Sequence, residues 1–219
     1  MHPGQITFFE YKSSPFGKYL LATSNGDLKE IFLWDIYNRC SLGPIEDQSA
    51  HSPDMILNVP KDYEVENMRW TGSAYQLYTT MKEASGQEDY ILCVYDVPDG
   101  QYGSNNIGAP TDETGRVSKV KKNVKSQFSP VQTVNLPLNI SYLCLNENNK
   151  NIIYGTNDTK KFSIDLRTPK TISLFQDESN DQVLSGKEDA MVEYNPNNYI
   201  TFANRLQKSI LIYDVRQVS

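Results

Sequence analysis

Four times along the chain, a group of β-forming runs ends in an apolar residue followed by aspartate. The four closing pairs are Trp34-Asp35, Tyr95-Asp96, Ile164-Asp165 and Tyr213-Asp214. A unit that recurs in this way buries little apolar surface alone, so its copies must stack and share a continuous core. The repetition therefore predicts a repeat architecture.

Each unit consists of short β-forming runs separated by turn residues. In the first unit, runs at 6–11, 19–23 and 30–36 are separated by turns at 15–18 and 24–27, and the second turn contains Asn-Gly, a strong hairpin signal. Later runs lie at 55–59, 65–70, 76–80, 90–96, 131–134, 141–145, 152–156, 162–166, 171–175, 190–194, 199–203 and 210–215. No segment has a helical period, so the sequence predicts an all-β chain.

The four units extend over residues 5–59, 65–136, 140–175 and 189–219, and together they form one repeat region over 1–219. A polar, glycine-rich segment at 98–104 opens an insertion, 98–128, that we expect to be mobile. The insertion carries a cluster of five cations with no acidic residue among them: Arg116, Lys119, Lys121, Lys122 and Lys125. The whole chain has a formal net charge of −6, so it has no global basic field.

The cysteines and the apolar runs indicate the cellular compartment of the protein. Cys40, Cys93 and Cys144 are widely spaced, and no spacing resembles a zinc site. We expect them to be small buried hydrophobic residues in a reducing compartment. The first residues lack the features of a signal peptide, and no apolar run approaches the ~20 residues of a membrane span. The sequence predicts an intracellular protein, cytoplasmic or nuclear, without a membrane partner.

The first and third units carry a recognisable motif. Residues 21–27 lead into 31–35 and the closing Trp-Asp pair, and residues 153–166 follow the same template with Ile164 in place of Trp. In these features the chain resembles the WD-repeat family of β-propellers. The resemblance implies a propeller of four-stranded antiparallel blades, about four of them recognisable. It also implies a hydrogen-bonded network within the repeat, to which Thr23 or Ser24, Asp27, Trp34 and, in the third unit, Asp158 would contribute, with His51 as the candidate for the histidine role.

The spacing of the units predicts an incomplete ring. The closing aspartates lie 61, 69 and 49 residues apart, whereas a blade needs about 40–50 residues, so the first two intervals contain insertions. The fourth unit ends with its third run. We therefore expect the sequence to be part of a longer propeller, or another segment or chain to complete it, because an open arc leaves unpaired backbone groups at its ends.

Residues suited to catalysis are sparse. The two histidines, His2 and His51, lie outside the β-forming runs, and Ser24 and Ser185 lack the context of a nucleophile. The acidic runs at 177–181 and 188–189 lack the spacing of a calcium loop. From these observations the sequence predicts that the chain is not an enzyme and has no catalytic residue, metal site or cofactor.

The candidate function is that of a protein–protein interaction scaffold, a WD-repeat-like subunit of a larger complex that binds other proteins through turns at 24–29, 82–89, 157–161 and 204–208. An alternative is a substrate receptor of a ubiquitin ligase. Asp165-Leu166-Arg167 and Asp214-Val215-Arg216 resemble the box through which some WD-repeat proteins dock on a ligase adaptor, although Asp and Arg could instead pair locally. A further alternative is a nucleic-acid or ribonucleoprotein assembly factor that uses the basic cluster, which could equally be a solvated loop.

Overall fold

The computed structural model describes residues 6–13, 19–25, 30–35, 53–71, 75–86, 88–97, 127–146, 148–157, 160–174, 190–195, 199–204 and 209–215, and the structural statements below concern these residues. They form sixteen strands and no helix. The prediction of an all-β chain is confirmed. No helix among the described residues is long and apolar enough to cross a membrane.

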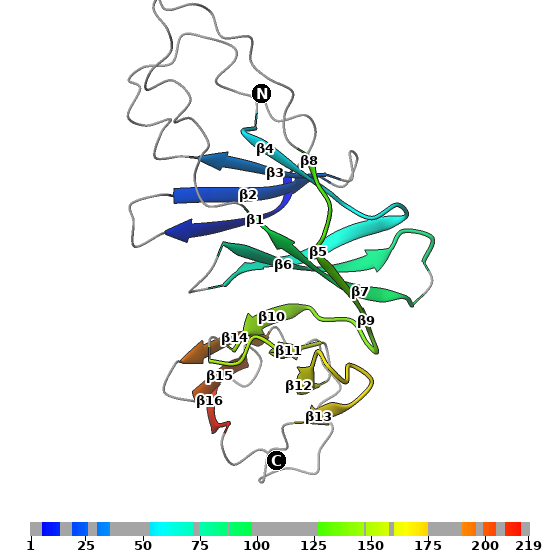
Figure 1. Cartoon of the computed structure of the whole chain (residues 1–219). Coiled ribbons are helices and arrows are strands. Elements are labelled where there is room, and N and C mark those ends of the chain that lie inside the picture. The colour runs from blue at the N-terminus through cyan, green and yellow to red at the C-terminus, as the bar shows by residue number, and fades with distance from the viewer. Residues whose placement is uncertain are drawn as a thin grey trace, which may run out of the picture.

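The strands form four sheets whose first strands follow one another along the chain (Figure 1). The first sheet contains β1 (Ile6–Ser13), β2 (Tyr19–Asn25), β3 (Glu30–Asp35), β4 (Met55–Asn58) and β8 (Gln127–Phe128). The second contains β5 (Tyr63–Trp70), β6 (Gln76–Glu83), β7 (Tyr90–Asp96) and β9 (Gln132–Leu136). The third contains β10 (Tyr142–Leu145), β11 (Ile152–Thr156), β12 (Lys161–Asp165) and β13 (Ile172–Leu174), and the fourth contains β14 (Ala190–Asn195), β15 (Tyr199–Asn204) and β16 (Ser209–Asp214).

Neighbouring strands within each sheet pair antiparallel, with one exception. Strand β8 pairs parallel to β4, with Gln127 opposite Ile56 and Phe128 opposite Leu57. Phe128 is partly buried against the core between the first two sheets, and this burial favours an ordered strand. The last two residues of the predicted mobile insertion over 98–128 form this strand, whereas residues 98–126 lie outside the described part of the chain, so the mobility of the insertion stays a prediction.

The sheets pack against one another because side chains alternate along their strands and both faces of a sheet become buried. On β7, Ile91, Cys93 and Tyr95 point into a first core that the second sheet shares with the first sheet. Leu92 and Val94 point the other way, into a second core that the second sheet shares with the third. A third core lies between the third and fourth sheets, where Cys144, Tyr154 and Ile200 are buried among the described residues.

Polar contacts add to this apolar packing where adjacent sheets meet. The buried hydroxyl of Tyr95 donates a hydrogen bond to the carbonyl oxygen of Asn58 at 2.8 Å, which connects the second sheet to the first. The amide Nδ2 of Asn67 donates to the carbonyl oxygen of Ser141 at 2.6 Å, which connects β5 to the residue before β10. The first strands of successive sheets are in contact: β1 with β5, β5 with β10, and β10 with β14.

Two of the predicted buried cysteines lie within the described strands. Cys93 is fully buried on β7 and Cys144 nearly so on β10, and both are free thiols. Burial raises the pKa of the Cys93 thiol, which keeps it protonated near neutral pH. The prediction of small buried hydrophobic residues is confirmed for these two, and Cys40 lies outside the described residues.

Gly155 is closely packed against side chains of the second core. A Cβ atom added at this position on β11 would lie 2.8 Å from Cε2 of Phe162 and 2.9 Å from Cγ2 of Ile140. Both neighbours are buried, at 0% and 1% exposure, so neither side chain can move away freely. The absence of a side chain at residue 155 is therefore a packing requirement.

We predict that Gly155→Ala lowers the free energy of unfolding by about 1–3 kcal/mol, because the added methyl overpacks the second core. Urea-induced unfolding of the full chain measures this loss. Ser173→Ala on the exposed strand β13 is the matched control, and its effect should stay within about 0.5 kcal/mol. Equal stability of the two variants would contradict the packing argument.

Candidate interaction surface

The residues predicted to form the repeat network are only partly described. Thr23 and Ser24 lie on β2, where the backbone register places them opposite Phe32 and Ile31 of β3. Trp34 on β3 packs edge-on against Phe32, with ring centroids 5.9 Å apart and an interplanar angle of 62°. Asp27, His51 and Asp158 lie outside the described residues, so the network stays a prediction.

The basic cluster of the insertion and the second Asp-x-Arg box also lie outside the described residues: Arg116, Lys119, Lys121, Lys122, Lys125 and Arg216. Among the predicted partner-binding residues, the structure describes Arg167. It lies two residues beyond β12 on an exposed turn of the third sheet.

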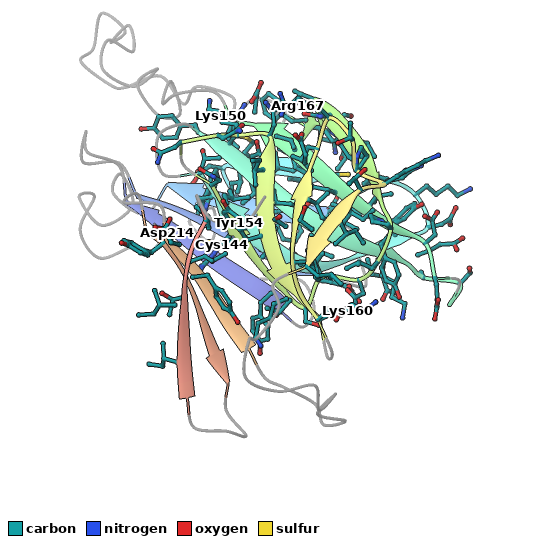
Figure 2. The ribbon with its side chains drawn as sticks, turned by 90° about the horizontal axis from the view of Figure 1, so that it is seen from below. Cys144, Lys150, Tyr154, Lys160, Arg167 and Asp214 are labelled. Carbon is teal, nitrogen blue, oxygen red and sulfur yellow. The ribbon has the colours of Figure 1, made fainter. Side chains whose placement is uncertain are left out.

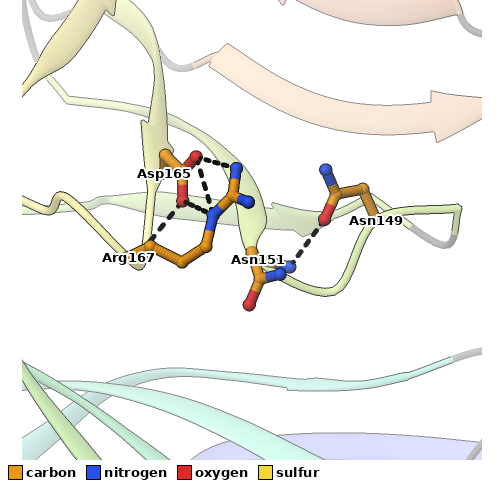
Figure 3. A network of polar contacts seen from close by, with 4 residues as sticks. All are labelled: Asn149, Asn151, Asp165 and Arg167. Carbon is orange, nitrogen blue, oxygen red and sulfur yellow. Dashed lines mark hydrogen bonds and ion pairs between the residues drawn. The ribbon is translucent and has the colours of Figure 1, made fainter.

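Arg167 is bound to the aspartate that precedes it by two residues (Figure 3). Its Nε donates to Oδ1 and Oδ2 of Asp165 at 2.9 and 3.1 Å, and its Nη2 donates to Oδ2 at 2.5 Å. The backbone N–H of Arg167 also donates to Oδ1 of Asp165, at 2.9 Å. The sequence left open whether Asp165 and Arg167 pair with each other, and the structure shows that they do. A fork of parallel donors on one carboxylate fixes the plane of the guanidinium group.

The pair is anchored to the turn between β10 and β11. The N–H of Leu166, between the two charged residues, donates to the carbonyl oxygen of Asn151 at 2.7 Å. Within the turn, the backbone N–H of Asn151 donates to Oδ1 of Asn149 at 3.1 Å (Figure 3). The turn and the Asp-Arg pair therefore form one hydrogen-bonded unit.

A buried asparagine holds the start of the same turn. Oδ1 of Asn146 accepts the backbone N–H groups of Asn148 and Asn149, each at 2.9 Å, and its Nδ2 donates to the hydroxyl of Tyr154 at 2.9 Å. Asparagine caps turns in this way because its side chain can bond the backbone two and three residues further on. Sequence reasoning missed this element, although the run of asparagines at 146–151 was the available signal.

The exposed residues of these two turns form what we call the turn surface: Asn148, Lys150, Asn151, Arg167, Thr168 and Lys170. Figure 2 shows Lys150 and Arg167 at the same end of the third sheet, and Lys160 at the opposite end. The Arg167 side chain remains 65% exposed although it is paired. The turn surface therefore presents three cations on a hydrogen-bonded framework.

A second predicted binding turn lies between β6 and β7. Strand β6 extends to Glu83, so the turn is shorter than the predicted 82–89, and its Gly86 adopts a left-handed φ of 87°. The Tyr63 hydroxyl donates to Oδ2 of Asp89 at 2.7 Å. This hydrogen bond, followed by burial, raises the pKa of Tyr63 to about 12, so the phenol stays protonated at neutral pH. The turn is thereby tied to β5.

Arg167 also determines the protonation of Asp165. Its side-chain hydrogen bonds, followed by its backbone N–H, lower the pKa of the Asp165 carboxyl from the ordinary 3.8 to about 2. The same hydrogen bond raises the pKa of Arg167. Both groups are charged across the physiological pH range.

In the described part of the chain, no cluster of three or more His, Cys, Asp or Glu side chains could hold a metal ion.

We predict that the Asp165 carboxyl titrates with a pKa of about 2 in the folded protein. The folded-state pKa is depressed, so the stabilisation from the pair is present above the unfolded pKa of 3.8 and is lost as the pH falls towards about 2. NMR titration of the Asp165 carboxyl measures this value.

Arg167→Gln removes the cation and should return the pKa of Asp165 towards 3.8. Lys160→Gln, at the opposite end of the sheet, should leave it depressed and serves as the control. An ordinary pKa in the unmodified protein would contradict the observed pairing.

Comparison with known proteins gives little support for a family. No protein-family model matches the chain, and no curated protein matches it. Among the solved structures that it matches is a calcium-binding protein, regucalcin, from Agrobacterium tumefaciens, with 14% sequence identity and a TM-score of 0.46. The match covers 93% of this chain and 55% of the regucalcin chain, so this chain spans about half the length of that protein. A likeness of this size does not identify a function.

One prediction is corrected. The sequence predicted that the chain is not an enzyme, because catalytic motifs were missing. A single fold hosts both binding proteins and enzymes, so missing motifs do not exclude catalysis. The exclusion of catalysis was therefore wrong.

Proposed function

We propose that the chain is a protein–protein interaction scaffold, a WD-repeat-like subunit of a larger complex, whose four sheets are blades of a β-propeller with an incomplete ring. The order of the sheets supports this, because the first three strands of each sheet are consecutive and the sheets begin one after another along the chain. The contacts between first strands support it further, because a propeller arranges its sheets around one axis.

Burial on both faces suits such a scaffold. The second sheet lies between the first and second cores, so its two faces are occupied by packing inside the molecule. The groups that remain available to bind a partner are those of the turns and of the outermost sheets. Turns on a rigid framework are where binding residues are commonly placed.

The main observation in support of the proposal is the fixed orientation of the exposed Arg167 side chain. Its guanidinium donates three hydrogen bonds to Asp165 and its backbone N–H donates a fourth, yet most of the side chain is still exposed. A side chain that is already ordered loses less conformational entropy when a partner binds. Arg is also enriched at protein interfaces. With Lys150 and Lys170 beside it on the turn surface, Arg167 fits an acidic protein partner.

The two alternatives have less support. A ubiquitin-ligase receptor would also use Arg167, together with the second Asp-x-Arg box, whose Arg216 lies outside the described residues. A nucleic-acid assembly factor would use cations that lie outside the described residues. An intracellular site of action, cytoplasmic or nuclear, is part of the proposal.

We predict that charge reversal on the turn surface removes partners from the complex. The tagged full-length chain would be isolated from native extract as Lys150→Glu and Arg167→Glu variants, washed at low and at high salt, and its partners identified by mass spectrometry. The variants should lose a discrete set of proteins that the unmodified chain retains at low salt, because rim charges act through complementary charges on the partner.

Lys160→Glu introduces the same charge change at the other end of the sheet and should retain the set. Melting temperatures of all three variants control for folding. Recovery of the same partners by the turn-surface variants would overturn the role of this surface. Ligase subunits within the lost set would favour the receptor alternative, and RNA that is released at high salt would favour the nucleic-acid alternative.

A further inference from the structure

The turn that follows β12 carries an exposed threonine, Thr168, directly before Pro169. Two consecutive β-turns meet at this threonine. Its backbone N–H donates to the carbonyl oxygen of Asp165 at 2.9 Å and closes the first turn, and its own carbonyl oxygen accepts the N–H of Thr171 at 2.9 Å and closes the second. The backbone of Thr168 is therefore held at the junction of the turns, while its side chain lies on the surface.

The hydroxyl group of Thr168 makes no hydrogen bond to any residue that the structure describes. The polar contacts of this turn come from backbone groups and from the pair of Asp165 and Arg167. Threonines of the second sheet differ in this respect, because the hydroxyls of Thr71 and Thr79 donate to backbone carbonyl oxygens. Within the described residues, the Thr168 hydroxyl therefore has no structural role and is accessible to an enzyme.

Pro169 influences the backbone of the residue before it. A proline disfavours the α conformation at the preceding position and biases that residue towards an extended backbone. Protein kinases bind the acceptor residue in an extended conformation, and proline-directed kinases select a following residue that has no N–H donor. An exposed hydroxyl directly before a proline therefore has the chemistry that such kinases recognise.

The segment around Thr168 can open without the loss of a core. From residue 167 to 171, no side chain belongs to any of the three cores. The next strand, β13, is the edge strand of the third sheet within the described chain, and its Ser173 and Leu174 are exposed. A kinase that binds residues 167–171 would break the two turn hydrogen bonds and bury no competing cost of unpacking. Openings of this kind belong to the low end of the range of local unfolding free energies.

A phosphate group on Thr168 would lie among cations. Arg167 precedes the threonine directly and Lys170 follows two residues later. Lys150 lies at the same end of the third sheet as Arg167 (Figure 2), and the two turns are hydrogen-bonded to each other. The described anion of these turns is Asp165, which is already paired with Arg167. The turn surface therefore offers lysines that can bind a phosphate.

From these observations we infer that Thr168 is a phosphorylation site for a proline-directed protein kinase, and that phosphate at this residue makes the turn surface release its acidic partner. In the reaction, the hydroxyl oxygen of Thr168 attacks the γ-phosphorus of ATP. The bond from that phosphorus to the bridging oxygen breaks, ADP leaves with the electron pair, and the hydroxyl proton passes to a base of the kinase. The release of a partner rests on the proposed scaffold function, whereas the modification depends on the local structure alone.

The change in charge explains the release. The described charged groups of the two turns are three cations and one carboxylate, which give a formal charge of +2: Lys150, Arg167, Lys170 and Asp165. A phosphothreonine carries about −1.5 to −2 at neutral pH and brings this sum close to zero. Its oxygens also bind the lysines that would otherwise bind carboxylates of the partner. Both effects weaken the attraction of an acidic protein.

Ser129 provides a matched comparison within the described chain. It is exposed and directly precedes a proline, as Thr168 does. It differs in its surroundings, because no charged residue lies within three positions of it in the sequence. It belongs to the connection between β8 and β9, where Val131 donates its N–H to the carbonyl oxygen of Val94 at 2.8 Å. A negative charge at Ser129 therefore tests the effect of added charge outside the turn surface.

Phosphorylation of the full-length chain in vitro tests the site. The purified chain would be incubated with Mg-ATP and a purified mitogen-activated protein kinase, which is proline-directed, and the modified residues identified by mass spectrometry. We expect phosphothreonine at residue 168. Pro169→Ala should lower its rate of formation by about tenfold or more, whereas Ser129→Ala should leave it unchanged. The absence of phosphate at residue 168 in the correctly folded chain would overturn the inference.

Phosphorus NMR tests the surroundings of the phosphate without the need for a partner. Nearby cations favour the dianion, so the second pKa of the phosphate should lie below its ordinary value of about 6. Lys170→Gln should raise this pKa towards the ordinary value, and Lys160→Gln, at the opposite end of the sheet, should not. An ordinary pKa in the unsubstituted, phosphorylated chain would overturn the pairing of the phosphate with the turn surface.

Recovery of partners from native extract tests the release. The phosphorylated chain and the Thr168→Glu variant should recover about tenfold less of the partner set than the unmodified chain. Ser129→Glu should recover the full set, and phosphatase treatment should restore recovery by the phosphorylated chain. Melting temperatures of the variants control for folding. A protein that binds the phosphorylated chain alone would show that the phosphate recruits a partner, and would overturn the release.

The outcomes separate this inference from the proposed function. If the phosphorylated chain retains the full set while Lys150→Glu loses it, the release is overturned and the scaffold function stands. If Lys150→Glu also retains the full set, the role of the turn surface fails. Phosphate found at residue 168 would support the modification site in either case.

Discussion

The alternation of side chains along each strand is the constraint on which the rest of this structure depends. It allows β7 to contribute Ile91, Cys93 and Tyr95 to one core and Leu92 and Val94 to the next, so a single strand joins two cores. Burial of apolar area at roughly 25 cal/mol per Å² is the main favourable term in such packing. Every other feature, including the turns and the hydrogen bonds between sheets, is arranged around this two-sided burial.

The same constraint explains how well the strands could be predicted. Runs such as 90–96 and 152–156 have unbroken β-forming residues bounded by turns, and their strands begin and end close to the predicted limits. Strand β8 was missed because two residues, Gln127 and Phe128, carry no local signal and are ordered by pairing with the distant Ile56 and Leu57. Short-range patterns do not encode such long-range pairs.

The site was less predictable than the fold. The Asp165–Arg167 pair was visible as a motif, and its local pairing was one of two interpretations, because spacing alone does not determine where a guanidinium points. The asparagine turn that supports the pair was not predicted, because the sequence does not show that Asn146 is buried and bonded to Tyr154.

The position of the second sheet between two cores has a consequence for how the chain opens. Its detachment would break both the first and the second core, because β7 contributes buried side chains to each. The second sheet should therefore open at a higher free energy than exposed turns such as the one that carries Arg167. Chaperones and proteases that sample partial openings would meet such turns first, while the second sheet stays folded.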